Sequence, residues 1–172
     1  MNNPVIRFGV FSGLAATILF LGPLVVSPDS FLKPENMASG EVIGYTSMFL
    51  AMTLVYFGAR AHRKEKGGNY SFGDGFKAGL LITVVSTVVF YLGNVLVYEV
   101  IKPGFLEELM TFYRDYMVEQ GMSEAELAQM DANSEIMSNG WIYAVVMASS
   151  TFLMGLVIAL ISGLKLKRTA TA

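Results

Sequence analysis

The sequence predicts an all-α integral membrane protein, a four-helix bundle with an extracytoplasmic helical hairpin between the third and fourth spans. Three observations predict this fold. The chain has 172 residues, which suits a single membrane domain over residues 1–172. Four stretches have long cores without charged residues. The long segment between the last two of them carries polar and apolar residues at helical spacing.

The four predicted spans cover residues of about 5–26, 42–61, 74–101 and 140–164. Each contains a core of roughly 18 or more residues without Asp, Glu, Lys or Arg. A helix rises about 1.5 Å per residue, so each core reaches across a hydrocarbon layer of about 30 Å, the second only just. Inside that layer the backbone amides must be paired within their own segment, which favours helices over isolated strands.

The first stretch also has to be compared with a cleaved signal peptide. A signal peptide has an apolar region of about 7–15 residues that ends in small residues. The apolar run here is longer, and it is followed by Pro28, which is a poor neighbour for a cleavage site. We therefore expect residues 5–26 to remain as the first span.

The distribution of basic residues predicts the orientation, because cytoplasmic loops carry an excess of Lys and Arg. Nine of the twelve basic residues fall on the side of the two termini and the loop between the second and third spans. They are Arg7, Arg60, Arg63, Lys64, Lys66, Lys77, Lys165, Lys167 and Arg168. The other side holds Lys33, Lys102 and Arg114. We predict cytoplasmic N- and C-termini and an extracytoplasmic segment 102–139.

Residues 102–139 are predicted to form the outer helical hairpin. Apolar residues recur at helical spacing from Phe105 to Tyr116, and Gly121 is placed to end that helix. A second helix is expected after Ser123. Two basic minus eight acidic residues give this segment a net charge of −6. It either docks a partner or packs on its own bundle, and we favour the second.

Two sequence motifs mark helix starts. Ser71 and Asp74 form a capping box that opens the third span, and Ser123 and Glu126 form another in the outer segment. The basic segment 62–70 before the first motif is expected as a loop. We interpret it as a topology signal, with a patch for anionic lipid as the alternative.

Small residues at four-residue spacing let helices approach closely in lipid. The helix-packing candidates of this kind are Gly9, Gly13, Gly75, Gly79, Gly155, Ala159 and Gly163. They predict close contacts, either within one bundle or between two copies of the chain. Because four spans offer enough internal partners, we favour contacts within the bundle.

Hydroxyl and amide side chains are expected at or near the bilayer midplane. They are Thr17, Thr53, Ser86, Thr87, Asn94, Ser150 and Thr151. Such a set could line a weakly polar path, but Ser and Thr also bond to the carbonyl one turn back, so we favour a role in helix packing. Asn94 is expected to bond to a neighbouring helix. Tyr98, Trp141 and Tyr143 are expected at the outer boundary, where aromatic belts lie.

The sequence argues against an enzyme and against a bound cofactor or metal. His62 is the single histidine, and cysteine is absent. Such a chain cannot assemble a zinc triad, a pair of haem ligands or a Cys–His dyad. It also lacks the Gly-Lys-Ser/Thr of a phosphate-binding loop. We predict a non-enzymatic protein without catalytic, cofactor-binding or metal-binding residues.

Four motifs carry a family resemblance: GYTSM at 44–48, YFGARAHR at 56–63, GNYSFGDGFKAG at 68–79 and KPGFLE at 102–107. With them the chain resembles, over nearly its whole length, the bacterial membrane family catalogued as domain of unknown function 4199. The resemblance implies about four spans and no established activity. The family occurs mainly in Gram-negative bacteria of the Bacteroidetes type, which implies the cell inner membrane.

We therefore predict a multi-pass inner-membrane protein with a structural, accessory or assembly role. Its expected partners are the lipid bilayer and either a second copy of the chain or another membrane protein, with no nucleic acid. The competing hypothesis is a small transporter or channel subunit that uses the midplane side chains. The absence of charge from the span cores weighs against ion-coupled transport.

Overall fold

The computed structural model describes residues 3–168, which form helices joined by short turns. The helices are α1 (Pro4–Val26), η1 (Pro28–Leu32), η2 (Pro34–Asn36), α2 (Met37–Lys66), α3 (Phe72–Val95), η3 (Leu96–Ile101), α4 (Phe105–Glu119), α5 (Glu124–Met137) and α6 (Gly140–Leu166). Within the described range, β-type pairing is limited to one isolated bridge between Tyr70 and Arg168. The predicted all-α class is confirmed.

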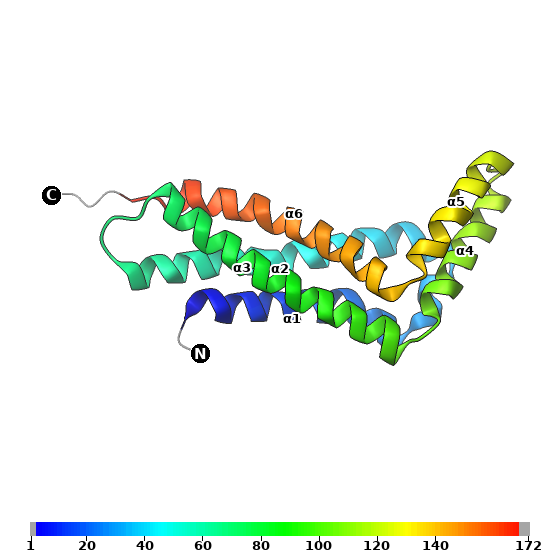
Figure 1. Ribbon diagram of the computed structural model, residues 1–172, viewed down its shortest axis with the longest axis horizontal. Helices are drawn as coiled ribbons and strands as arrows, with labels where there is room; N and C mark the ends of the chain where they lie inside the picture. The colour runs from blue at the N-terminus through cyan, green and yellow to red at the C-terminus, as the bar shows by residue number, and fades with distance from the viewer. Residues whose placement is uncertain (1–2, 169–172) are drawn as a thin grey trace.

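Four segments are long and apolar enough to cross a membrane: Pro4–Val26, Pro34–Lys66, Phe72–Ile101 and Gly140–Leu166. They lie side by side as an elongated bundle (Figure 1). Only 33–39% of the most apolar window of each segment is buried inside the protein. Large apolar side chains face outward instead, as Ile18 does with 66% of its surface exposed. So extensive an apolar surface fits lipid better than water.

α3 is central to the bundle, because it contacts α1, α2 and α6. Gly9 of α1 lies against Val85 and Thr17 of α1 lies against Gly93, so α1 and α3 run in the same direction. α2 and α6 run in the opposite direction (Figure 1). The alternation brings the start of α1 and the end of α6 to one end of the bundle and places α4 and α5 at the other, which we call the α4–α5 end.

The interior of the bundle is mainly aliphatic and aromatic. Met48, Met52 and Phe90 are fully buried at its centre. A hydrogen bond joins two spans there: the Ser12 hydroxyl donates to the Ala51 carbonyl oxygen over 2.8 Å. Because no water competes inside a bilayer, this bond helps to hold α1 against α2.

Both predicted capping boxes are present. The Ser71 hydroxyl accepts from the Asp74 amide, and the Asp74 carboxylate accepts from the Ser71 amide. Ser123 and Glu126 make the same pair of bonds at the start of α5. Gly121 follows α4 with a φ of +79°, a conformation that favours glycine, so the predicted helix stop is also confirmed.

α2 is longer at both ends than the span 42–61 expected from the sequence. It begins at Met37 and continues to Lys66, through part of the segment expected as a loop. Its last turn carries Arg63 and Lys64 besides Lys66, and these positive charges are favourable at the negative end of the helix dipole. Gly67, with a φ of +63°, ends the helix. Hydropathy marks the apolar core of a span and is silent about polar helical turns beyond it.

α4 and α5 lie side by side across one end of the bundle (Figure 1). An ion pair joins them, with 2.8 Å between Arg114 Nε and Asp131 Oδ1. The first turns of α4 are buried in an apolar cluster whose buried members are Leu21, Leu24, Val97, Tyr98, Phe105, Leu106 and Leu109. α4 is thereby fixed to the ends of α1 and η3.

Candidate functional site

The predicted packing residues of α3 and α6 form one antiparallel contact. The facing pairs are Gly75 with Gly163, Gly79 with Ala159, and Thr83 with Gly155. A Cβ atom at position 75 would lie 3.0 Å from the Cα atom of Gly163, so there is no room for a side chain. Steps of four residues on each helix place a small residue at each crossing and let the two backbones touch.

The predicted packing residues of α1 face α3. A Cβ atom at Gly9 would lie 2.7 Å from the Val85 Cβ, and one at Gly13 would lie 2.6 Å from the Ser86 carbonyl oxygen. The structure thus places all seven packing candidates at contacts inside a single chain. These surfaces are already filled by the protein's own helices.

Most of the predicted midplane hydroxyls bond within their own helix. Those of Thr17, Thr53, Ser150 and Thr151 donate to carbonyl oxygens three or four residues back, over 2.6–3.4 Å. The Ser86 hydroxyl lies 4.0 Å from the Met52 sulfur. All seven midplane candidates are described residues, and no hydrogen bond joins any two of them. The structure does not gather them into one polar site.

Two buried polar atoms of α3 have no hydrogen-bond partner among residues 3–168: Thr87 Oγ1 and Asn94 Oδ1. Asn94 is fully buried, and its amide nitrogen donates to the Phe90 carbonyl oxygen over 2.8 Å. The expected bond from Asn94 to a neighbouring helix is therefore wrong. In an apolar surrounding the carbonyl one turn back is the nearest acceptor, and the side chain folds onto its own helix.

A cavity of about 370 Å³ lies at the α4–α5 end of the bundle. Its walls come from the end of α1, the two short helices η1 and η2, the start of α2, η3, α4 and the start of α6. Its volume is within the range of about 300–1,000 Å³ typical of ligand sites. The lining is mainly apolar; its polar members are Ser30, Asn36, Ser39, Glu41, Tyr45, Tyr98, Tyr113 and Tyr143.

Four tyrosines from four different elements line this cavity: Tyr45, Tyr98, Tyr113 and Tyr143. The rings of Tyr98 and Tyr143 are nearly perpendicular, with centroids 5.2 Å apart, which is a favourable edge-to-face contact. Glu41 is the one charged residue of the lining. Burial raises the pKa of the Tyr113 hydroxyl, and the nearby Glu41 and Tyr45 raise it further. The cavity therefore presents four phenol side chains and a single carboxyl group.

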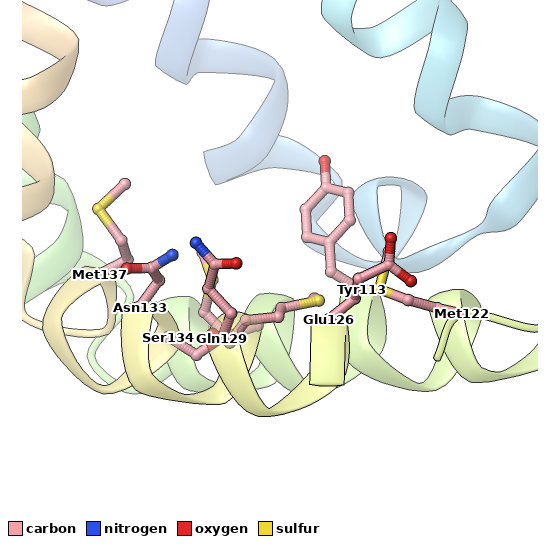
Figure 2. A pocket seen from close by; sticks show the side chains of 9 residues that line it. Tyr113, Met122, Glu126, Gln129, Asn133, Ser134 and Met137 are labelled. Atoms are coloured by element: carbon pink, nitrogen blue, oxygen red, sulfur yellow. The ribbon is translucent and has the colours of Figure 1, made fainter. Parts of the chain in front are cut away.

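A shallower hollow of about 390 Å³ lies between α4 and α5. Figure 2 shows its side chains projecting from these helices on the side that faces the ends of the spans. Its methionines are Met110, Met122, Met130 and Met137. Thioether side chains adapt easily to different shapes. Tyr113 lines this hollow as well as the cavity, so its ring is shared by the two sites.

The sequence analysis does not identify the cavity. It assigns Tyr98 and Tyr143 to an aromatic belt and leaves Glu41 just outside the second span. A signal was present, because all four tyrosines fall at the outer end of a predicted span or in the outer segment. Their convergence depends on α4 crossing the bundle end, and this crossing has no sequence signature.

A comparison with protein families supplies the relationship. The profile of the family described as "Protein of unknown function (DUF4199)" matches residues 7–168. The chain belongs to the DUF4199 family. The matched region includes the four spans, α4 and α5, and every residue that lines the cavity. No curated protein and no solved structure matches the chain. The resemblance expected from the motifs is confirmed, and DUF4199 membership assigns no chemistry to the cavity.

Proposed function

We propose that this DUF4199 protein is a non-enzymatic accessory protein of the inner membrane, and that its cavity holds an amphipathic, lipid-like molecule. The observation that carries the proposal is that apolar residues lining the cavity are also exposed on the outer surface of the bundle. Leu19 and Ile43 both line the cavity, yet 45% and 59% of their surfaces are exposed, on spans whose outer faces are apolar. A hydrocarbon chain can therefore pass from the surrounding lipid into the cavity without leaving apolar surface.

The composition of the lining supports binding rather than catalysis. Among the lining residues there is one carboxylate, Glu41, and no histidine, lysine or arginine. General acid–base chemistry usually needs a pair of groups with opposed proton affinities. The bonds that the midplane hydroxyls make to their own helices likewise support a closed bundle rather than a transport path.

The bilayer is the first partner in this proposal. A second copy of the chain, or another membrane protein, would have to dock on the remaining outward-facing side chains, because the glycine contacts are already filled within the chain. The hollow between α4 and α5 is one such surface. We give lipid priority because the apolar exterior extends around all four spans.

We also propose that both termini are cytoplasmic and that residues 102–139 lie outside. The start of α1 lies at the same end of the bundle as the basic ends of α2 and α6, which supports this orientation (Figure 1). Because the chain has no cysteine, a single introduced cysteine would be the one thiol that a reagent can label. An impermeant thiol reagent on intact spheroplasts should label Glu119→Cys and not Lys64→Cys. The reverse pattern would refute the orientation.

The cavity proposal is tested by blocking the site. Gly40 lines the cavity, and a Cβ atom there would meet no atom within 4 Å, so Gly40→Phe can place a ring in the opening. Gly40→Ala is the matched control. Native mass spectrometry after gentle delipidation should show one retained lipid-sized molecule on the wild type and on Gly40→Ala, and none on Gly40→Phe. Equal retention by all three proteins would contradict the proposal.

A further inference from the structure

The lining of the cavity also indicates which head group it recognises. We infer that the site selects amphiphiles that carry an ammonium group, with the head beside Glu41 and the tyrosines and the hydrocarbon chain along the apolar wall. This inference rests on the proposed function and adds the chemical class of the ligand to it.

The aromatic residues supply the first argument. The face of an aromatic ring carries partial negative charge and attracts a cation within about 6 Å, and ammonium groups are commonly held between several rings. Tyr45, Tyr113 and Tyr143 belong to α2, α4 and α6, so rings from three helices surround the space. The perpendicular packing of Tyr143 on Tyr98 fixes one of these rings in place.

Charge supplies the second argument. Glu41 gives the lining its one formal charge, and no basic side chain lines the cavity to pair with an anionic head. Glu41 and Tyr113 line the same cavity; burial is the main cause that raises the pKa of the Tyr113 phenol, and Glu41 adds to it. The neighbouring segment 102–139 adds a net charge of −6 within the same end of the molecule. Such a field concentrates cations and repels phosphate or carboxylate heads that lack a counter-charge.

The apolar wall supplies the third argument. Leu19, Leu24, Ile43 and Met147 present hydrocarbon on the other side of the space. A small free amine would leave this surface uncovered, whereas a chain of several methylenes would gain from each buried group, at about 0.8 kcal/mol per CH₂. The lining as a whole therefore fits a molecule that joins an ammonium head to an alkyl tail.

Two sources of such a molecule can be separated by experiment. The full-length protein in maltoside detergent is titrated calorimetrically with short-chain phosphatidylethanolamine, short-chain phosphatidylglycerol and decyltrimethylammonium. The inference predicts that one or both ammonium ligands bind about tenfold more tightly than phosphatidylglycerol. Binding of the ethanolamine lipid assigns the bilayer as the source, and binding of the alkylammonium alone assigns a free amphiphile.

Variants locate the preference in the cavity. Glu41→Gln should weaken ammonium binding about threefold to tenfold, whereas the binding of the anionic phosphatidylglycerol should stay the same or become tighter. Tyr45→Leu should weaken it about fivefold, and Tyr45→Phe, which keeps the ring, should not. Tyr45 is 51% exposed, so either change leaves the fold intact.

The failures of the two proposals are distinguishable. If phosphatidylglycerol binds as tightly as both ammonium ligands, and Glu41→Gln changes none of the three, the ammonium inference is overturned and the cavity remains a general lipid site. If Gly40→Phe leaves the binding of all three ligands unchanged, the cavity is not the binding site and the proposed function fails with the inference.

Discussion

Gly79 of α3 lies directly on Ala159 of α6: a Cβ atom at position 79 would stand 2.8 Å from the Cα atom of Ala159. This approach is one of three crossings at which α3 and α6 touch through small residues. A larger side chain would meet the backbone of the facing helix at Gly75 and Gly79 and the Thr83 side chain at Gly155, so the contact ties the stability of the bundle to residue size at a few defined positions.

Substituting these small residues should destabilise the bundle. Gly79→Leu, Gly155→Leu and Ala159→Leu are each expected to cost about 1–3 kcal/mol, because the added methylenes meet the facing helix. Gly22→Leu is the matched control, since a Cβ atom at Gly22 would meet nothing within 4 Å. Thermal unfolding in detergent should rank the three variants below the control. Equal unfolding midpoints for Gly155→Leu and Gly22→Leu would show that the contact at Gly155 has room for a larger side chain.

The unpaired oxygen of Asn94 leads to a different expectation. Because Asn94 Oδ1 has no partner, replacing the amide by an apolar side chain of similar size removes a desolvation cost and only one hydrogen bond. Asn94→Leu should therefore be within about 1 kcal/mol of the wild type or more stable. Asn94→Asp should be clearly less stable at neutral pH, because it places a carboxylate in an apolar site. A large loss of stability in Asn94→Leu would mean that the amide has a polar partner in the membrane.

Tyr70 connects the loop before α3 to the residues that follow α6. Its backbone exchanges two hydrogen bonds with Arg168, of 2.8 and 2.7 Å, and its buried hydroxyl lies 3.1 Å from His62 Nδ1. Tyr70→Phe should cost about 1 kcal/mol at neutral pH, and Tyr70→Ala about 3–5 kcal/mol. Unfolding midpoints in detergent would give both values.

The difference between the wild type and Tyr70→Phe should also depend on pH. Burial is the main cause that raises the pKa of the Tyr70 hydroxyl, and Asp74 adds to it. A phenol whose pKa is raised by folding contributes stability below its unfolded pKa of about 10 and loses it as the pH rises further. The wild type should therefore lose its advantage over Tyr70→Phe in alkaline buffer. A constant difference up to strongly alkaline pH would contradict this account.

The capping box of α5 should respond to acid. Hydrogen bonds from the Ser123 hydroxyl and amide lower the pKa of Glu126, so its contribution is present above the usual glutamate pKa and is lost as the pH falls through the lowered value. Hydrogen exchange in the first turn of α5 should become faster in the wild type than in Glu126→Gln under acid, because glutamine keeps the cap at any pH. Equal exchange rates in the two proteins under acid would show that the Glu126 carboxylate does not stabilise the first turn of α5.

The spans could be predicted because a bilayer imposes a length and an absence of charge that composition reveals directly. The helix starts at Ser71 and Ser123 could also be predicted, because a capping box is recognised from four consecutive residues. The bounds of α2 could not be read in this way. Its polar end turns, up to Lys66, are stabilised by basic side chains at the helix end and not by hydropathy.

The cavity was beyond sequence reasoning for a different reason. Its lining combines residues as distant as Leu19 and Met147, and their meeting depends on where α4 turns after η3. No periodicity encodes that angle. For the same reason the midplane hydroxyls looked like a set in the sequence, although in space Thr17 and Thr151 each bond to their own helix.

The position of α3 has a consequence for biogenesis. Ribosomes deliver α1 and α2 first, and this pair can associate through Ser12 and Ala51 before the rest of the chain exists. Gly9 and Gly13, however, fit against α3, and α6 packs more extensively on α3 than on α2. The α1–α2 pair can therefore form early, but completion of the bundle has to wait for the third span, which must displace lipid from Gly9 and Gly13.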